Sequence, residues 1–199
     1  MPITNRPSRR AVLLSSVAAI AGVGVLARLS GVFASETIVG KPGKVKIHRF
    51  TDLGKSIGVE EMDKVVKTED EWRVLLAGAP PSSAGQTAFG VTRQADTEWA
   101  TTGPGWNRHD KGLYRCICCD NALYTHETQF DSGTGWPSFW QPIAKENVVQ
   151  DHAEQGGFEV TCSLCDAHLG HVFNDGPAPT YLRYCMNAVA MRFIPWTTT

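Results

Sequence analysis

Six cysteines in this 199-residue chain all lie between Cys116 and Cys185. A clustered set of thiols is typical of a disulfide framework, a metal site or a redox centre. Four of them form two Cys-x-x-Cys pairs, Cys116/Cys119 and Cys162/Cys165. A two-residue spacer lets both sulfurs of a pair face one point, and two such pairs complete the tetrahedral ligand set of zinc. The spacing therefore predicts one structural Zn²⁺ per chain, held by these four thiolates.

Two alternatives to zinc remain open for the pairs: a short disulfide within each pair, or a thioredoxin-like redox pair. A redox pair needs a βαβ context, which the sequence around the cysteines lacks. Because four thiolates leave no ligand position open, the ion is expected to join two distant segments and to do no chemistry. Cys118 lies inside the loop of the first pair and is expected to be a small buried residue.

Cys185 lies outside both pairs, in an apolar run over residues 181–193. If this run is a strand, Arg183, Cys185 and Asn187 share one face. A cation beside a thiol lowers its pKa and raises the thiolate fraction. The alternative is a buried, inert thiol, which the polar partners on the same face disfavour. We therefore expect Cys185 to carry the chemistry.

Two histidines and an aromatic loop supply further candidates. His168 and His171 follow the second cysteine pair. Since the thiolates already complete the zinc site, these histidines are expected to do acid–base or substrate-binding work, with structural histidines as the alternative. Two glycines break the chain just before Trp136, which favours a pocket wall for that ring, whereas Phe139 is expected to pack in the core.

The elements that must position these residues are short and mostly extended. Residues 44–50 partly alternate, a turn follows at 52–55, and 56–59 resembles a returning strand, so a β-hairpin is predicted. Thr68 and Glu71 form a capping-box pattern ahead of a short helix that carries Trp72. Residues 78–85 are loop, and no long helical period follows them. The remaining short apolar runs predict a β-rich domain.

Composition narrows the class of protein. With 42% hydrophobic, 20% charged and 9% aromatic residues the chain is globular and not disordered. Its 19 basic and 20 acidic residues leave no basic surface for nucleic acid. Four of the arginines and none of the acids lie in residues 1–34, so the remainder holds 15 basic against 20 acidic residues, a net charge of −5.

Residues 1–34 are expected to be an export signal. Arg9-Arg10 precedes an uncharged stretch over 11–27 and resembles a twin-arginine signal. Small side chains ahead of Ser35 offer a cleavage site, and an uncleaved membrane anchor is the alternative. The globular part is expected outside the cytoplasm, in the periplasm, where disulfides are common. The twin-arginine resemblance implies export of folded protein, so zinc could bind before export.

From about residue 64 to 193 the chain resembles the B-type methionine-R-sulfoxide reductases, a family of peptide-methionine (R)-S-oxide reductases. The resemblance rests on several segments taken together. They are Glu71-Trp72, Val91-Thr92-Arg93, Thr97-Glu98, Gly112-Leu113-Tyr114-Arg115-Cys116, Asp131-Ser132-Gly133-Thr134-Gly135-Trp136-Pro137-Ser138-Phe139, Cys162-x-x-Cys165, His168-Leu169-Gly170-His171-Val172-Phe173-x-Asp175-Gly176-Pro177 and Arg183-Tyr184-Cys185-x-Asn187.

The resemblance implies a fold of two antiparallel sheets, tent- or barrel-like, with a short N-terminal helix and a four-cysteine zinc clamp away from the active centre. It also implies that Cys185 attacks the sulfoxide sulfur. That sulfur is electrophilic once its oxygen is protonated, so the site needs a thiolate, a proton donor and an apolar slot for the methyl group. The residues expected to fill these roles are Cys185 as nucleophile, His168 and His171 as proton donors, Asn187 on the polarised oxygen, Arg183 beside the thiolate, and Trp136, Phe173 and Asp175 at the substrate.

Regeneration is expected to differ from much of the family, because many members carry a resolving cysteine where this chain has Thr134. Cys118, inside a zinc loop, is a poor substitute. An external thiol or a thioredoxin-like partner is therefore expected to reduce a sulfenic acid on Cys185. The expected organisation is a signal at 1–34, an extension with the hairpin at 35–62, and a reductase domain at 63–199 acting on oxidised methionines of exported proteins.

Two other functions fit parts of the pattern. A zinc-clamped β-module could bind a ligand in an aromatic cage without turnover, but it has no reason to assemble Cys185 with His168 and His171. A thiol peroxidase-like scavenger would leave the predicted Trp136 pocket unexplained.

Overall fold

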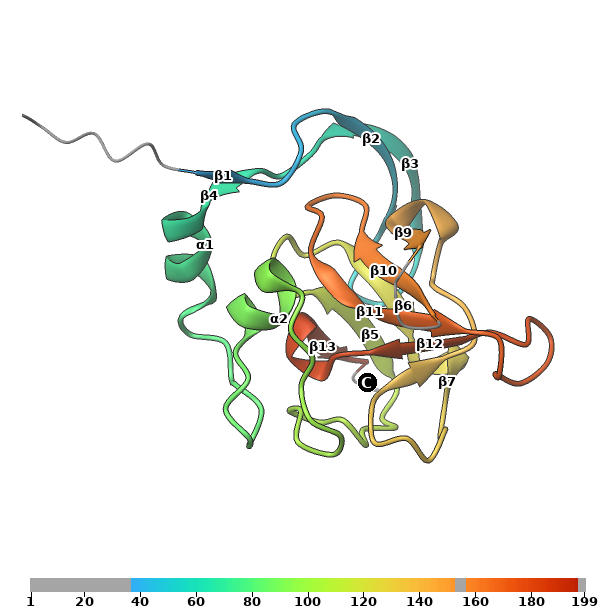
Figure 1. The fold of residues 1–199 in the computed structure, drawn as a ribbon. Coiled ribbons are helices and arrows are strands. Elements are labelled where there is room, and N and C mark those ends of the chain that lie inside the picture. Colours follow the sequence, from blue (N-terminus) through green and yellow to red (C-terminus); the bar gives the residue numbers. More distant parts are fainter. Residues whose placement is uncertain (1–36, 153–156, 197–199) are drawn as a thin grey trace, which may run out of the picture. The chain divides into compact units, whose positions relative to one another are not determined.

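The computed structural model describes residues 37–152 and 157–196. The predicted export signal at residues 1–34 lies outside the described residues. Within the described ranges, no helix is long and apolar enough to cross a membrane. Most regular structure in these ranges is extended, and every strand pair is antiparallel (Figure 1).

The larger sheet has six strands and carries the Cys185 segment at its centre. In spatial order the strands are β7 (Gln129–Phe130), β8 (Ser138–Phe139), β12 (Arg183–Met186), β11 (His168–Phe173), β10 (Phe158–Cys162) and β9 (Val148–His152). The two strands that flank β12 come from segments about 15 to 45 residues away in sequence, so the site depends on long-range pairing.

A second sheet has three strands, and two ribbons of two strands complete the β structure. The second sheet runs β13 (Met191–Pro195), β5 (Gly112–Cys116) and β6 (Ala122–Thr125), and the ribbons are β2 (Lys44–Phe50) with β3 (Ser56–Asp63) and β1 (Ile38–Val39) with β4 (Lys67–Thr68). The prediction of a mainly β fold built on two antiparallel sheets is confirmed.

The predicted hairpin is the β2–β3 ribbon, and its second strand runs four residues further than the sequence indicated. Ile47 of β2 is buried. Asn147, in the 3₁₀ turn Lys145–Asn147, accepts from His48 N–H through Oδ1 at 2.9 Å and donates through Nδ2 to His48 O at 2.9 Å. The Asn147 amide thus forms the two hydrogen bonds with the His48 backbone that a neighbouring strand would otherwise form. These bonds hold the hairpin on the domain.

Helix α1 (Glu69–Leu76) begins where the capping box predicts. The Thr68 side chain accepts from Glu71 N–H at 3.3 Å, and the Glu71 carboxylate accepts from Thr68 N–H at 2.8 Å. The helix buries Trp72 and Leu76. A reciprocal cap satisfies two of the free N–H groups of the first turn, which lets a helix of only two turns persist.

A second helix, α2 (Ala88–Gln94), was missed in the sequence. It has only seven residues, the third of which is Gly90, so the sequence shows no helical period. Thr87 caps it by accepting from Gly90 N–H at 3.1 Å, and Ala95 ends it in the left-handed conformation at φ 53°. Burial of Phe89 and Val91 holds this short helix in place.

The run at 181–193, expected to be one strand, is three elements. Strand β12 ends at Met186, the 3₁₀ turn η3 covers Ala188–Ala190, and β13 follows in the other sheet. The alternation that the sequence indicated holds within β12, where Tyr184 and Met186 are buried. The break lets one segment serve both sheets.

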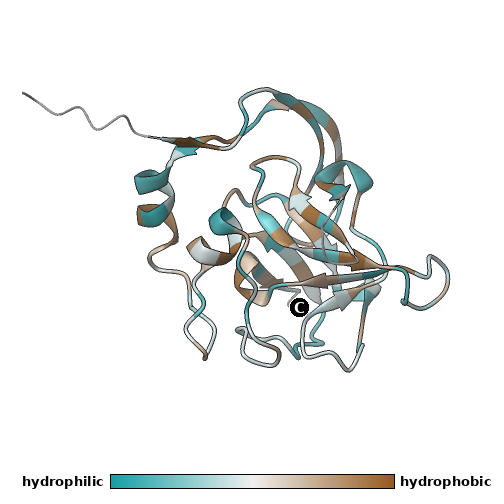
Figure 2. Cartoon of the chain, in the orientation of Figure 1, coloured by the Kyte–Doolittle hydropathy of each residue, from teal (hydrophilic) through white to brown (hydrophobic). Residues whose placement is uncertain are grey.

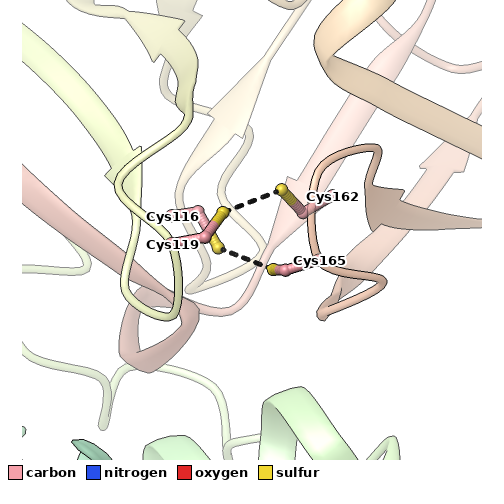
Figure 3. A group of neighbouring side chains, drawn as sticks. All are labelled: Cys116, Cys119, Cys162 and Cys165. Atoms are coloured by element: carbon pink, nitrogen blue, oxygen red, sulfur yellow. Dashed lines mark hydrogen bonds between the residues drawn. The ribbon is translucent and has the colours of Figure 1, made fainter. Parts of the chain in front are cut away.

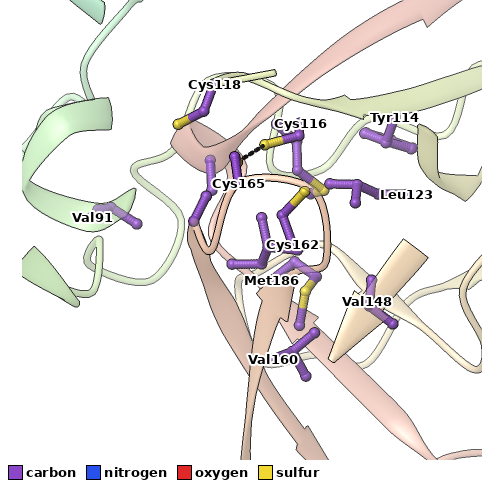
Figure 4. Close-up of a cluster of buried hydrophobic side chains, with 14 of the residues drawn as sticks. Val91, Tyr114, Cys116, Cys118, Leu123, Val148, Val160, Cys162, Cys165 and Met186 are labelled. Atoms are coloured by element: carbon purple, nitrogen blue, oxygen red, sulfur yellow. Dashed lines mark hydrogen bonds between the residues drawn. The ribbon is translucent and has the colours of Figure 1, made fainter. Parts of the chain in front are cut away.

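The core lies between the two sheets and is rich in aromatic rings. Phe139, predicted to be a core residue, is fully buried and stacks on Tyr124 with ring centroids 4.4 Å apart. Brown segments follow the strands in Figure 2. Figure 4 shows Met186 of β12 near the cysteine pairs, and Cys118 is buried as expected. The core therefore connects the strand that carries Cys185 to the cysteine cluster.

Candidate functional site: a metal cluster and a thiol cavity

The two Cys-x-x-Cys pairs meet in one cluster, in which three of the cysteines are buried and Cys119 is half-buried (Figure 3). All four Sγ atoms lie within 4.8 Å of one another, with Cys116 Sγ 3.7 Å from Cys165 Sγ and Cys119 Sγ 3.6 Å from Cys162 Sγ. Sulfurs bonded at about 2.3 Å to a tetrahedral zinc ion lie about 3.8 Å apart. The cluster therefore has the geometry of a four-thiolate metal site, and none of the six cysteines is in a disulfide.

Donors around the cluster favour thiolates over thiols. Asn121 Nδ2 donates to Cys162 Sγ at 3.5 Å, and Arg93 Nη2 donates to Cys165 Sγ at 3.5 Å. Arg93 also stacks on the Trp72 ring at 4.3 Å, so α2 brings a cation to a group that would carry net negative charge with a divalent ion bound. Nothing in the spacing of the cysteines indicated this role of Arg93.

Cys185 lies in a row of polar side chains across the larger sheet. In β12 it stands opposite His171 of β11 and opposite Ser138 of β8, and His171 stands opposite Glu159 of β10. Residues directly opposite in antiparallel strands share a face. The pairing therefore brings an imidazole to one side of the thiol and a hydroxyl to the other.

A β-bulge brings the two histidines to one face. The β10–β11 register shifts between Val160 and Thr161, so that Leu169 is an extra residue in β11. Residues three apart in a regular strand point to opposite faces. With the bulge, His168 and His171 share a face, and their rings meet edge to face at 5.3 Å.

Gly170 is required where β11 passes Cys185. Its φ of +153° lies in the region that L side chains rarely adopt, and a Cβ there would lie 2.2 Å from Cys185 O and 2.9 Å from Met186 Cα. Both of these are backbone atoms, so no side-chain rotation relieves the contact. The glycine therefore sets how closely the histidine strand approaches the thiol.

The thiol opens into a cavity of about 260 Å³. The cavity is lined by Thr97, Thr134, Trp136, Gly170, His171, Phe173, Arg183, Cys185 and Asn187. A larger groove of about 700 Å³ lies beside α1 and β13, but neither a cysteine nor a histidine lines it. The smaller cavity therefore places a thiol from outside the metal cluster beside apolar walls and polar groups.

Arg183 is held rigidly at the edge of this cavity. Its Nε donates to Asp175 Oδ1 at 2.9 Å and its Nη2 to Asp175 Oδ2 at 2.8 Å, while its guanidinium lies 4.5 Å from the centre of the Phe173 ring. The hydrogen bonds from Arg183 lower the pKa of the Asp175 carboxyl and raise the pKa of Arg183. The two hydrogen bonds to Asp175 and the contact with the Phe173 ring therefore keep the positive charge of the Arg183 guanidinium beside Cys185.

Burial has the largest effect on the pKa values of Cys185 and His171. It raises the pKa of the Cys185 thiol above its usual value, although the Arg183 charge and the hydroxyls of Thr134 and Ser138 act the other way. It lowers the pKa of His171, and the neighbouring His168 lowers it further. Near pH 7 both groups are therefore mostly neutral, and an imidazolium formed at His171 is a stronger acid than usual.

Glu98 holds two walls of the cavity, a role that sequence reasoning did not assign. Its N–H donates to Asn187 Oδ1 at 3.0 Å, and its C=O accepts from Trp136 Nε1 at 3.0 Å. Its buried carboxylate accepts from Ala188 N–H at 2.6 Å and Val189 N–H at 3.0 Å. Burial raises the pKa of Glu98. The only sequence signal was its place in the Thr97-Glu98 segment.

The structure brings most of the predicted site residues together. Trp136, His171, Phe173, Arg183, Cys185 and Asn187 all line the cavity. His168 and Asp175 do not. His168 is buried behind His171 with Nδ1 2.7 Å from Glu159 Oε1, and Asp175 reaches the site only through Arg183.

Comparison with known proteins accounts for this arrangement. A profile of the SelR domain matches residues 85–195. That is more than half of the chain, and it contains the cysteine cluster and the cavity. The chain belongs to the SelR domain family. The match begins after α1, so the β2–β3 hairpin and α1 precede the SelR domain.

Several curated relatives of this chain are named peptide methionine sulfoxide reductases. A peptide methionine sulfoxide reductase MsrB of Herminiimonas arsenicoxydans is 44% identical over 134 residues, which cover 66% of this chain and 92% of the relative. The MsrB of Thioalkalivibrio sulfidiphilus is 51% identical over 110 residues, or 53% of this chain and 80% of the relative. A chloroplastic peptide methionine sulfoxide reductase B1 of Oryza sativa is 44% identical over 128 residues, which cover 63% of this chain and 56% of the relative.

Proposed function

We propose that this protein is a peptide-methionine (R)-S-oxide reductase in which Cys185 attacks the sulfoxide sulfur. The observation that carries the proposal is the position of Cys185 in a SelR domain, at a small cavity with aromatic walls, an imidazole and a fixed guanidinium. The MsrB names of the relatives support the same reaction class.

The cavity offers different surroundings to the methyl group and to the oxygen of a methyl sulfoxide. Trp136 and Phe173 offer flat apolar surfaces for the S-methyl group, and the Trp136 ring is held by its bond to Glu98 O. His171 and Asn187 offer donors for the oxygen. One Asn187 N–H donates to Leu169 O at 3.2 Å, and its Oδ1 accepts from Glu98 N–H, so the amide is fixed with its second N–H left to donate.

The chemical step needs no net proton. The Cys185 sulfur forms a bond to the sulfoxide sulfur while the oxygen takes up a proton, and the oxygen then passes to Cys185 as the S–S bond breaks. The products are methionine and a sulfenic acid on Cys185. The proton released by the thiol balances the one that the oxygen accepts, and His171, directly across the strand pair, is placed to transfer it.

Arg183 assists by favouring the thiolate. Burial alone would hold Cys185 as a neutral thiol, and the guanidinium offsets part of that effect. Asp175 acts through Arg183 by fixing the orientation of its side chain. His168 acts through His171, whose ring it contacts.

Reduction of the Cys185 sulfenic acid back to the thiol is assigned to a thiol from outside the chain. Cys185 is the single cysteine among the cavity-lining residues, and Thr134 stands at the loop position that faces it. A thiol attacks the sulfenic sulfur and releases water, and a second thiol then frees Cys185 as a disulfide forms between the two reductants. A thioredoxin-like protein or a small dithiol has the required chemistry.

The cysteine cluster is assigned to a structural Zn²⁺. Cys116, Cys119, Cys162 and Cys165 would hold it, and their spacing fits a tetrahedral thiolate site. A closed four-ligand site supplies no open position for catalysis. Its contribution is to join the loop after β5 to the loop after β10 and so to support the sheet that carries Cys185.

The site of action is proposed to be the periplasm, with oxidised exported proteins as substrates. The support is the twin-arginine-like pattern of residues 1–34 in the sequence. A fusion of residues 1–34 to a fluorescent reporter checks it: export that stops when Arg9 and Arg10 are both replaced by lysine supports the assignment, and unchanged export contradicts it.

Turnover of separate diastereomers tests the reaction. The zinc-containing protein is assayed with the R and the S sulfoxide of one methionyl peptide and excess dithiothreitol, alongside Cys185→Ser. We expect turnover of the R form that depends on Cys185. Turnover of the S form alone, or R turnover that survives Cys185→Ser, would refute the proposal.

A further inference from the structure

Three hydroxyls that the mechanism above does not use form a connected group beside Cys185. Ser132 Oγ lies 2.8 Å from Thr134 Oγ1 and 2.8 Å from Ser138 Oγ. All three residues lie between β7 and the start of β8. We call Ser132, Thr134 and Ser138 the hydroxyl cluster.

Two residues of the hydroxyl cluster lie beside the Cys185 sulfur. Thr134 Oγ1 lies 4.0 Å from Cys185 Sγ. Ser138 stands directly opposite Cys185 in the β8–β12 pair. Its hydroxyl donates to Trp136 O at 3.2 Å and lowers the pKa of the Cys185 thiol. Ser138 is 1% exposed, so bulk water does not compete for its hydroxyl. The hydroxyls approach from the β8 side, whereas His171 approaches from β11.

Ser132 connects the two without touching the sulfur. Its Oγ accepts from Thr134 N–H at 3.4 Å, which leaves its own proton to donate to Thr134 or Ser138. The loop is fixed further by Asp131, whose Oδ1 accepts from Gly133 N–H at 2.9 Å. A hydroxyl rotates about its C–O bond, so Ser138 can turn its proton from Trp136 O toward the Cys185 thiolate as the thiolate forms.

We propose that Thr134 and Ser138 donate hydrogen bonds to the Cys185 thiolate and are catalytic residues, and that Ser132 is a positioning residue that orients both. The proposal rests on the proposed function of Cys185 as nucleophile and deepens it. Charge-assisted bonds to sulfur favour the thiolate over the thiol, which opposes the effect of burial. The hydroxyl cluster thereby acts together with Arg183, which lies on the same strand as Cys185.

Other charged groups around the thiol are few and fixed. They are Arg183 on the same strand with Asp175 bound to it, His171 on β11, Asp131 on the loop before β8, and Glu98, whose carboxylate is taken up by the N–H groups of η3. None of them contacts the hydroxyls of Thr134 or Ser138 through a described hydrogen bond. Removing a hydroxyl therefore leaves the charges around Cys185 in place.

The test is the pH dependence of iodoacetamide alkylation at Cys185, followed on its own peptide by mass spectrometry in the zinc-containing protein. Loss of one charge-assisted bond is expected to raise the midpoint by about one pH unit in Thr134→Val and in Ser138→Ala. A thiolate of higher pKa is also the better nucleophile. Each variant should therefore react about threefold more slowly below its midpoint and about threefold faster above it.

Controls separate this effect from damage to the fold. Ser132→Ala should raise the midpoint although Ser132 has no contact with the sulfur. Thr134→Ser keeps the hydroxyl and should keep the midpoint. Ser82→Ala removes a buried hydroxyl that bonds Gln86 in a distant segment of the sequence, and it should leave the profile unchanged.

An unchanged midpoint in both Thr134→Val and Ser138→Ala would overturn the proposal, as would a uniform change of rate at all pH values. If Ser138→Ala does not fold, the Thr134→Val and Thr134→Ser pair decides alone. Alkylation requires no sulfoxide, so this result stands apart from the turnover assay. A protein without reductase activity but with shifted midpoints would refute the proposed function and retain the thiolate contacts.

Discussion

Replacing Gly170 by alanine tests the close approach of the histidine strand to the thiol. The new Cβ would lie 2.2 Å from Cys185 O and 2.9 Å from Met186 Cα, where ordinary contacts are longer than 3.4 Å. The two strands would have to separate by about 1 Å, which costs about 1–3 kcal/mol as overpacking. The positive φ of Gly170 adds about 1–3 kcal/mol for a residue with a side chain.

Gly43 provides the matched control. Its φ of +157° is almost the same as that of Gly170, but a Cβ there would meet nothing within 4 Å. Gly43→Ala therefore carries the backbone cost alone. We expect Gly170→Ala to lower the free energy of unfolding by about 2–6 kcal/mol and Gly43→Ala by about 1–3 kcal/mol.

The assay is urea unfolding of the zinc-containing proteins, followed by tryptophan fluorescence, with turnover measured on the folded fraction. A displacement of Cys185 by about 1 Å is expected to reduce turnover by about 10²-fold in Gly170→Ala, with Gly43→Ala near wild type. Equal losses of stability in the two variants, or full activity in Gly170→Ala, would show that the β11–β12 spacing does not position the thiol.

Three further changes have defined outcomes. Arg183→Met removes the charge that opposes burial, so the pKa of Cys185 should rise further and kcat/KM should fall about tenfold near pH 7 and less at higher pH; a pH-independent loss would contradict this role. Cys116→Ser should abolish zinc binding, measured by elemental analysis of the purified protein, and lower the melting temperature; retained zinc would refute the assigned ligand set. Glu98→Ala leaves two N–H groups of η3 without their acceptor and should destabilise the fold by about 2–4 kcal/mol, measured by urea unfolding; a change below about 0.5 kcal/mol would argue against that contact.

Local signals in the sequence predicted the parts of the structure that depend on near neighbours. The capping box at Thr68 and Glu71 requires only four consecutive residues and is found as expected. The two Cys-x-x-Cys loops likewise encode their own geometry, so their meeting in one cluster followed from ligand number. Alternation within β12 correctly placed Arg183 and Cys185 on the face opposite Tyr184.

Features that depend on long-range pairing were not predictable in the same way. The bulge at Leu169 decides which face His168 occupies, and it exists only against β10. The opposition of Ser138 and Cys185 joins residues 47 positions apart. Helix α2 is stabilised by burial of Phe89 and Val91 and has too few residues to show a period. Glu98 gave no sign of burial, because its partners are N–H groups about 90 residues later.

The role of Cys185 as nucleophile is tested most directly by one turnover without reductant. The zinc-containing protein is mixed with one equivalent of the R sulfoxide peptide, trapped with dimedone and mapped by mass spectrometry. We expect one methionine formed per chain and a dimedone adduct on Cys185, absent in Cys185→Ser. A stable disulfide between Cys185 and Cys118, or methionine formed with no change at Cys185, would contradict it.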